Sequence, residues 1–482
     1  MRTWSPQQEA FFHEFQHGTG NIVGIARAGV GKTTTGVHGV TLAPERNILF
    51  CAFNKKIAQE LESRFGSQYP HVTVKTIHAV GYAIVRKCWE GVRCDFSSAR
   101  ADALAEQVCG AKTPDAIKRL VSKLHTKGRE IAPHATVIGD LTDLAMTFEL
   151  YPDDSWESLG FDMDYVEAKA LEAMELAASV RVSTIDGSDM LYLPIRNQWL
   201  AKTYDMVVVD EAQDMTVSQL EIAEGVCKGR IVIIGDDRQA IYAFRGADCD
   251  SLNRLKEKLD GKVLRLTTTY RCAKAIVREA QRLVPDFEAG DDNPEGEVLY
   301  APLDKLLTMV QPGDFVLSRV NAPLVSLAIS MLRAGKRARV AGRDLGAGLT
   351  ALVRKLKAAS IPDLMAKIAR WEQREVERMM KAKRPERVDA IHDQAEMLVE
   401  LARDARGMSD LDARISALFS DDGLGDAGVV TFSSVHRSKG LEANRVFVLE
   451  STLRDNNQEE LNIQYVAITR AKQTLVWVTG EV

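Results

Sequence analysis

The sequence predicts an α/β fold of two domains, each built on a parallel sheet and each carrying a mainly helical insertion. Short apolar runs rich in Val and Ile do not alternate with polar residues, which is typical of parallel strands buried on both faces. Helical segments separate the runs. The runs form two groups, one before about residue 270 and one after about residue 310, in a chain of 482 residues that is long enough for several domains.

Seven apolar runs mark the expected strands, and two strand-poor segments mark the expected insertions. Pro362 and Pro385 are helix breakers in the second of these segments. The expected strands are 22–25, 48–52, 206–209, 231–234, 315–317, 445–449 and 475–478. We expect the first domain at 1–87 and 182–275 with its insertion at 88–181, and the second at 276–350 and 426–482 with its insertion at 351–425.

Composition limits the classes of function. The net charge of −5 predicts no overall affinity for polyanions, so any nucleic-acid site must be a local basic groove. The segment 354–387 holds eleven Lys or Arg and five Asp or Glu, and is either a solvated helix face or a surface that faces a nucleic-acid backbone.

The seven cysteines are scattered without a Cys-x-x-Cys pair, which argues against a zinc ribbon or a disulfide scaffold and favours a reducing compartment. No apolar run approaches the ~20 residues of a membrane span, and the first residues do not resemble a signal peptide. We therefore expect a cytosolic protein, bacterial or from a phage-infected host, without membrane contact and without a fused nuclease.

The strongest local signal is a glycine-rich turn between an expected strand and an expected helix. Backbone amides of such a turn, together with a helix N-terminus, form a cradle for phosphate. Lys32 is expected to reach the β- and γ-phosphates of a nucleotide, and Thr33 to place its hydroxyl on Mg²⁺. Ala26 stands where the usual pattern opens with glycine. The expected cradle is Ala28, Gly29, Val30, Gly31, Lys32, Thr33 and Thr34.

Two acidic residues follow the strand expected at 206–209. Asp210 at the strand end is suited to hold Mg²⁺, and Glu211 to orient and deprotonate an attacking water. Gln239, after the next expected strand, offers a neutral amide that could sense a γ-phosphate. Tyr242 and Phe244 offer faces on which bases can stack, although such aromatics are commonly core residues.

In order along the chain, these motifs resemble those of superfamily 1 helicases of the UvrD/Rep type, which have two RecA-like domains. The resemblance covers about two thirds of the chain and is weakest in the insertions. Phe244 stands where the family usually has Trp, and the second insertion is short, as in phage-type helicases and the helicase core of the F-box DNA helicase. The segments that carry the resemblance are 5–10, 28–33, 53–55, 76–78, 210–214, 235–247, 269–271, 435–442 and 465–471.

The resemblance implies a set of nucleotide contacts. Gln7 would read adenine, Tyr270 would stack on it and Glu442 would bind the ribose. Arg271 and Arg470 would be arginine fingers that complete the site from the second domain. ATP and Mg²⁺ are the cofactors implied, with the nucleotide bound in a cleft between the domains.

The resemblance also implies a nucleic-acid path and an activity. The expected activity is ATP-dependent unwinding of DNA with 3′→5′ movement on single strands, on single-stranded or tailed duplex DNA. Translocation that removes bound proteins with little unwinding, a non-catalytic nucleic-acid-binding protein, and RNA as substrate stay open as alternatives. The expected nucleic-acid contacts are Phe53, Asn54, Thr76, His78, Tyr242, Phe244 and His436.

Overall fold

The computed structural model describes residues 3–90, 95–148, 150–152, 156, 159–179, 184–241, 251–381, 388–419 and 428–480. The chain divides into two compact units, one of Met1–Arg27 with Gly31–Leu266 and one of Ala28–Val30 with Thr267–Val482. Each unit contains a six-stranded sheet whose strands all pair in parallel, which confirms the predicted fold class. The units meet in sequence at Leu266 and Thr267, whereas we expected a boundary at 275/276.

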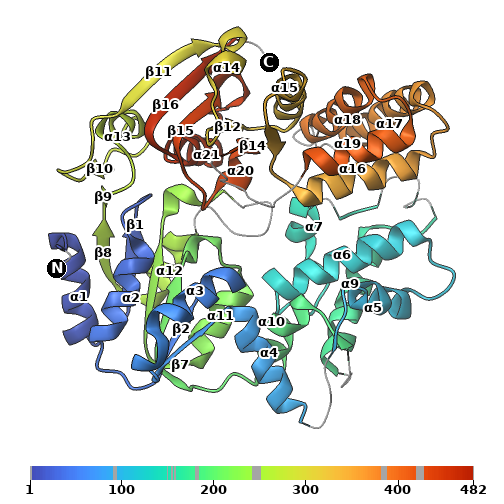
Figure 1. The fold of residues 1–482 in the computed structure, drawn as a ribbon. Coiled ribbons are helices and arrows are strands. Elements are labelled where there is room, and N and C mark those ends of the chain that lie inside the picture. Colours follow the sequence, from blue (N-terminus) through green and yellow to red (C-terminus); the bar gives the residue numbers. More distant parts are fainter. Residues whose placement is uncertain are drawn as a thin grey trace. The chain divides into compact units, whose positions relative to one another are not determined.

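The sheet of the first unit has the order β3-β2-β6-β7-β1-β8 (Figure 1). The four interior strands contain the runs predicted as strands, while β3 and β8 at the two edges were not predicted. The strands are β1 (Ile22–Ala26), β2 (Ile48–Cys51), β3 (Val72–Lys75), β6 (Tyr204–Asp210), β7 (Cys227–Gly235) and β8 (Lys262–Leu266).

Helices cover both faces of this sheet, which explains why its strands lack an apolar–polar alternation. Val207 and Val209 share a core with Ile222 of α11. On β1, a Cβ added to Gly24 would lie only 2.9 Å from Phe11 of α1, so α1 lies very close to the strand. The helices packed around the sheet are α1 (Pro6–His17), α2 (Lys32–Leu42), α3 (Lys55–Phe65), α4 (Ile77–Cys88), α10 (Gly187–Arg196), α11 (Val217–Val226) and α12 (Ser251–Leu259).

The first insertion is helical, as predicted, and has a core of its own. Trp89 at the end of α4 and Tyr192 of α10 belong to that core, so the insertion rests on these two helices. The short strands β4 (Asp95–Phe96) and β5 (Thr184–Ile185) pair where the chain leaves and re-enters the sheet domain. The described helices of the insertion are α5 (Arg100–Cys109), α6 (Asp115–Ile131), α7 (Thr142–Phe148) and α9 (Met163–Ser179).

The sheet of the second unit has the order β11-β16-β15-β12-β14-β13, and a two-stranded pair, β9 with β10, precedes it. Its strands are β9 (Thr268–Thr269), β10 (Glu288–Ala289), β11 (Glu297–Pro302), β12 (Phe315–Ser318), β13 (Ala338–Val340), β14 (Val430–Ser434), β15 (Ala443–Leu449) and β16 (Ala471–Thr479). Its helices outside the insertion are α13 (Lys274–Ala280), α14 (Leu303–Met309), α15 (Ala322–Arg333), α20 (Val435–Ser438) and α21 (Gln458–Ile468).

The second insertion is also helical but shares its core with the sheet. Leu364, Ile368 and Trp371 of α17 lie in one apolar cluster with Val316 and Phe432 of the sheet. In Figure 1 these helices form the orange bundle beside α15. They are α16 (Arg343–Leu356), α17 (Ile361–Lys381), α18 (Val388–Arg403) and α19 (Met408–Leu418). Among the described residues, no helix is both long and apolar enough to span a membrane.

Candidate nucleotide site

The phosphate loop has the backbone that its glycines predict. Gly29 (φ 69°) and Gly31 (φ 82°) both adopt the left-handed conformation that glycine tolerates without strain. Gly31 is the N-cap residue of α2 and has no side chain to cap the helix, so the first amides of α2 are suited to an anion. Ala26 pairs with Leu266 as the last residue of β1, which explains why an alanine fits there.

Lys32 is a buried cation at the start of α2, and its Nζ lies 3.1 Å from Oε2 of Glu211. Burial by itself would lower the pKa of Lys32. The carboxylates of Glu211, Asp236 and Asp210 outweigh burial and raise the pKa above its usual value. Lys32 is therefore charged and lies in the same cluster as the acidic pair.

Asp210 ends β6 and accepts a hydrogen bond of 2.6 Å from the hydroxyl of Thr33. Burial, reinforced by the neighbouring charge of Glu211, raises the pKa of Asp210 to about 6. A hydroxyl and a carboxylate side by side are oxygen ligands of the kind that Mg²⁺ prefers, together with substrate phosphates. Both predicted metal ligands thus fit that ion. In the described part of the chain, no group of three or more His, Cys, Asp or Glu is arranged to hold a metal on protein ligands alone.

Glu211 has a strained backbone. It adopts the left-handed conformation (φ 54°, ψ 43°), which costs a non-glycine residue of order 1 kcal/mol. Its side chain is held from two sides, by Lys32 and by Gln213, whose Nε2 donates to Oε2 over 2.7 Å. Strain of this kind persists where surrounding contacts enforce it, and here it fixes the direction of the carboxylate.

Asp236, at the end of β7, connects the remaining polar residues of this site. Its backbone N–H donates to Oε1 of Gln213, and its carboxylate accepts hydrogen bonds from Arg27 (3.2 Å) and Gln239 (2.7 Å). Burial raises the pKa of Asp236 although Lys32 and Arg27 oppose that rise. A chain of three hydrogen bonds thus joins Gln239 to Glu211, through Asp236 and Gln213. Gln213 and Arg27 were missed by sequence reasoning, although Gln213 stands only two residues after Glu211.

The glutamine that contacts α2 is Gln8. Its side chain is buried, and Nε2 donates to the hydroxyl of Thr35 over 3.0 Å. The Gln8 side chain also completes a capping box with Ser5. Gln7, the glutamine predicted to read adenine, is only half-buried. The Ser-Pro opening of α1 was the available signal, because it places the capping-box glutamine at position 8.

In the second unit, Arg271, Glu442 and Lys472 form a charged triad. Arg271 Nε lies 2.5 Å from one carboxylate oxygen of Glu442, and Lys472 Nζ lies 2.6 Å from the other. Burial would raise the pKa of Glu442, but Lys472 and Arg271 lower it. The structure brings together the predicted finger Arg271 and the predicted ribose ligand Glu442. Lys472 was missed; its signal was the Arg-Ala-Lys order after position 469.

Arg470 is almost wholly buried, 1% exposed. Its guanidinium donates to the carbonyls of Val466 and Leu441 and to the hydroxyl of Thr469. These acceptors are neutral, and burial, helped by the nearby charge of Arg271, lowers the pKa of Arg470 to about 10. Arg470 is therefore held in place by neutral acceptors, and its burial disfavours the charged form. An anion bound nearby would stabilise that charge.

The residues Ala28–Val30 group with the second unit by their contacts. The N–H of Ala28 donates to the hydroxyl of Tyr465, and the N–H of Tyr270 donates to the carbonyl of Gly29, each over 3.0 Å. A Cβ on Gly29 would lie 2.5 Å from Cβ of Arg271. Within this unit, the predicted adenine-stacking residue and the predicted finger thus lie beside the first residues of the phosphate loop. The ring of Tyr270 is 51% exposed and offers a face.

The predicted nucleic-acid contacts of the first unit lie at the same end of the sheet as the nucleotide residues, the end at which the parallel strands finish. Because all strands are parallel, the carboxyl ends of β2 and β3 lie on the same side of the sheet as those of β1, β6 and β7. Phe53 is 36% exposed after β2, Asn54 caps α3, and Thr76 caps α4 after β3. Burial lowers the pKa of His78 on α4.

Two of the predicted contacts, Tyr242 and Phe244, lie outside the described residues. His436 of the second unit is half-buried on α20, directly after β14. Its neighbour Arg437 makes a double hydrogen bond to Asp344 (2.7 and 2.6 Å).

A loop with this backbone between β1 and α2, and an acidic pair at the end of β6, define a protein of the phosphate-loop α/β class. The chain belongs to the UvrD/REP helicase family: residues 4–260 match the UvrD/REP helicase N-terminal domain, and residues 429–478 match the UvrD-like helicase C-terminal domain.

Curated relatives are similar to the chain at modest identity. F-box DNA helicase protein 1 of Schizosaccharomyces pombe is 24% identical over 523 residues, which cover 96% of this chain and 56% of that protein. ATP-dependent DNA helicase UvrD2 of Mycobacterium tuberculosis is 25% identical over 532 residues (94% and 75%). ATP-dependent DNA helicase Rep of Escherichia coli is 25% identical over 312 residues (59% and 43%). The chain thus spans about half the length of the fission yeast protein.

Proposed function

We propose that the chain is an ATP-dependent DNA helicase or translocase that moves 3′→5′ on single-stranded DNA. The observation that supports this best is the joint arrangement of Lys32 with Glu211 and of Thr33 with Asp210 around the phosphate loop. These four side chains supply a phosphate ligand, two metal ligands and a base, which are the groups that phosphoryl transfer to water requires.

In the proposed reaction, ATP binds with its β- and γ-phosphates on the loop amides and Lys32. When bound, Mg²⁺ neutralises charge on the phosphate oxygens, with Thr33 and Asp210 as its protein ligands. Glu211 accepts a proton from the water whose oxygen attacks the γ-phosphorus, and the bond to the bridging oxygen of ADP breaks. Arg271 and Arg470 of the second unit would complete the charge around the γ-phosphate, so that the nucleotide bridges the two units and hydrolysis drives their movement along DNA.

For adenine recognition we propose Gln8 in place of Gln7. Gln8 is buried and bonded to Thr35 on α2, whereas Gln7 is half-buried. Exchange of Gln8 for Ala is expected to weaken selection of ATP over GTP, and exchange of Gln7 for Ala to leave it unchanged. The opposite result would restore Gln7.

Two assays test the activity. Release of phosphate from ATP is measured with and without single-stranded DNA, and with RNA of the same length. Displacement of strands is measured on duplexes with a 3′ or a 5′ tail. We expect DNA to stimulate hydrolysis and unwinding to begin from the 3′ tail. Unwinding only from the 5′ tail would overturn the polarity, and a lack of DNA-stimulated hydrolysis would overturn the activity.

A translocase that strips bound proteins with little unwinding is the second candidate. The small size of the second insertion favours it, since α16–α19 share one apolar core with the sheet of the second unit. This candidate would be favoured if the chain displaces a protein bound to single-stranded DNA but does not separate duplex strands at the same rate of ATP hydrolysis. We also propose that the protein acts in the cytosol.

A further inference from the structure

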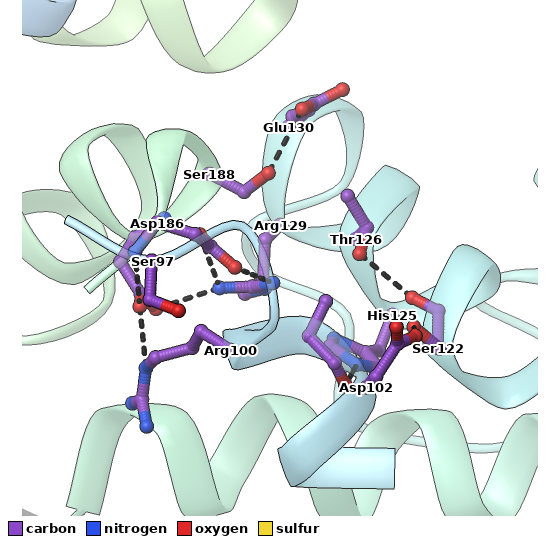
Figure 2. A network of polar contacts seen from close by, with 12 residues as sticks. Ser97, Arg100, Asp102, Ser122, His125, Thr126, Arg129, Glu130, Asp186 and Ser188 are labelled. Carbon is purple, nitrogen blue, oxygen red and sulfur yellow. Dashed lines mark hydrogen bonds and ion pairs between the residues drawn. The ribbon is translucent and has the colours of Figure 1, made fainter. Parts of the chain in front are cut away.

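A buried ion cluster joins the first insertion to the sheet domain. Arg129 of α6 is 0% exposed and donates to both carboxylate oxygens of Asp186 (3.0 and 2.9 Å) and to Asp189 (2.7 Å). Arg100 of α5 donates to the other oxygen of Asp189 over 2.7 Å. Figure 2 shows the Arg129 guanidinium against Asp186, with Arg100 alongside. Two positive and two negative charges thus form a neutral cluster between α5, α6 and α10.

The carboxylates of this cluster also set the start of α10. Asp186 is the N-cap of α10, and its Oδ1 accepts the N–H of Asp189 over 2.8 Å. The Asp189 side chain in turn accepts the N–H of Asp186 over 3.2 Å. Because Oδ1 of Asp186 both binds Arg129 and caps the helix, a shift of α6 is expected to shift the start of α10 as well.

From α6 the contacts lead toward the acidic pair. The carbonyl of Arg129 accepts a hydrogen bond of 3.1 Å from the hydroxyl of Ser218, which is buried at the start of α11. Further along, His134 lies 2.9 Å from Glu221 of the same helix. The short segment that precedes α11 begins at Glu211. The position of α6 therefore bears on the segment that carries the proposed base.

A second set of contacts leads toward the predicted nucleic-acid face. The hydroxyl of Ser188, on α10, donates to Glu130 over 2.8 Å (Figure 2), and the charge of Glu130 acts on the pKa of His78. Helix α10 also packs on α4 backbone to backbone, since a Cβ on Gly81 would lie 1.8 Å from the carbonyl of Met190. Helix α4 therefore cannot move closer to α10 unless α10 moves with it.

Stability alone is a poor explanation for this cluster. Three of the buried nitrogens that have no hydrogen-bond partner among the described residues lie at this cluster: Nε of Arg129, Nη2 of Arg100 and Nδ1 of the neighbouring His125. Incompletely satisfied buried ion pairs are often no more stable than apolar replacements of similar volume. The cluster does, however, fix one geometry among three helices, because each charge must find the same partner again after any movement.

We propose that Arg129, Asp186 and Asp189 are positioning residues that couple nucleic-acid contact on α4 to the orientation of Glu211. This inference rests on the proposed function, because it assigns to the cluster the stimulation of ATP hydrolysis by DNA. Couplings of this kind are typically worth 5–150-fold.

The test measures the ratio of DNA-stimulated to basal ATP hydrolysis at saturating DNA. Arg129→Lys keeps the charge but loses the double hydrogen bond to Asp186. Ser218→Ala leaves the cluster whole and removes the hydrogen bond that joins Arg129 to α11, one of the two described contacts with that helix, so it remains informative if the Arg129 variant does not fold. Each is expected to lower the ratio at least about fivefold. The double variant is expected to lower it no further than Arg129→Lys alone, because both changes interrupt one route.

Arg230→Lys is the matched control. Arg230 is also buried and also paired, with Glu45, but it lies at the start of β7, at the other end of the strand from Asp236. It is expected to lose stability and to keep the ratio. An unchanged ratio in Ser218→Ala and Arg129→Lys, or an equal fall in Arg230→Lys, would overturn the coupling. A wild-type chain that hydrolyses ATP without DNA stimulation would instead overturn the proposed function itself.

Discussion

The hydroxyl of Thr33 and the carboxylate of Asp210 lie 2.6 Å apart although 177 residues separate them in sequence. The parallel order of the sheet produces this proximity. Strand β7 pairs with both β1 and β6, so the ends of β1 and β6 reach the same edge. Four predictions follow from the groups gathered at this edge and in the second unit.

Exchange of Lys32 for Ala is expected to abolish ATP hydrolysis. The change removes the cation that would bind the phosphates and leaves Glu211 without its partner at 3.1 Å. Phosphate release by the variant is compared with that of Lys305→Ala, an exchange at an exposed lysine of the second unit. Hydrolysis by Lys32→Ala at the wild-type rate would contradict the site.

Exchange of Asp210 for Asn is expected to stabilise the nucleotide-free protein at pH 7.5 while abolishing Mg²⁺-dependent hydrolysis. The pKa of Asp210 is raised to about 6 in the folded chain, above the ~3.9 of an exposed carboxyl. The folded state therefore binds the proton more tightly, and its stability contribution, complete below pH ~3.9, is lost as pH rises through about 6. At pH 7.5 the ionised carboxyl costs on the order of 3 kcal/mol, which Asn removes.

Thermal unfolding at two pH values checks this sign. The gain in Tm of Asp210→Asn over wild type should be larger at pH 7.5 than at pH 5. ATP with Mg²⁺ should raise the Tm of the wild type and raise that of the variant much less. If the variant is less stable than wild type at pH 7.5, the ionised carboxylate of Asp210 stabilises the folded protein and the prediction is wrong.

Exchange of Arg271 for Ala is expected to reduce hydrolysis by ~10³-fold or more, with nucleotide binding kept within about tenfold. The arginine would act on charge that develops in the transition state. Removing it also frees Glu442 from the contact at 2.5 Å. Single-turnover hydrolysis gives the rate, and fluorescence titration with a labelled nucleotide gives the affinity. Arg282→Ala, at an arginine whose side chain is 70% exposed, is the control.

Exchange of Gly29 for Ala is expected to destabilise the protein by about 1–3 kcal/mol. The added Cβ would lie 2.5 Å from Cβ of Arg271, and φ of 69° disfavours any side chain. Gly348→Ala serves as the matched control: this glycine lies within α16, a Cβ there would meet no atom within 4 Å, and helix propensity favours alanine by ~1 kcal/mol. Denaturant unfolding should therefore shift in opposite directions for the two variants.

The central parallel strands could be predicted because they are apolar on both faces. The runs behind β2, β6, β7, β12, β15 and β16 contain little else than Val, Ile, Leu, Met and Phe. Edge strands escaped prediction because one side of an edge strand is open to solvent: all four residues of β3 are only half-buried. β14 escaped although it is interior, because Thr431, Ser433 and Ser434 are buried polar residues whose role in a strand no periodicity reveals.

The site was predictable where a motif fixes the backbone and unpredictable where a side chain reaches across the fold. Lys32, Thr33, Asp210 and Glu211 follow from strand ends and glycines. The hydrogen bonds that join Gln213 to Glu211 and to the backbone N–H of Asp236 depend on the distance between the ends of β6 and β7. That distance cannot be derived from the sequence. Whether Tyr242, Phe244 and His436 contact nucleic acid stays a prediction.

The apolar cluster that unites α17 with β12 and β14 has a practical consequence for dissecting the chain. Deleting the second insertion would take α18 away from α15 and α19 away from β13, and so would expose apolar side chains of a cluster that is now buried. A protein without the insertion would expose an apolar surface to solvent and is expected to aggregate on expression. The second insertion resembles a removable module in the sequence, but its helices belong to the hydrophobic core of the second unit.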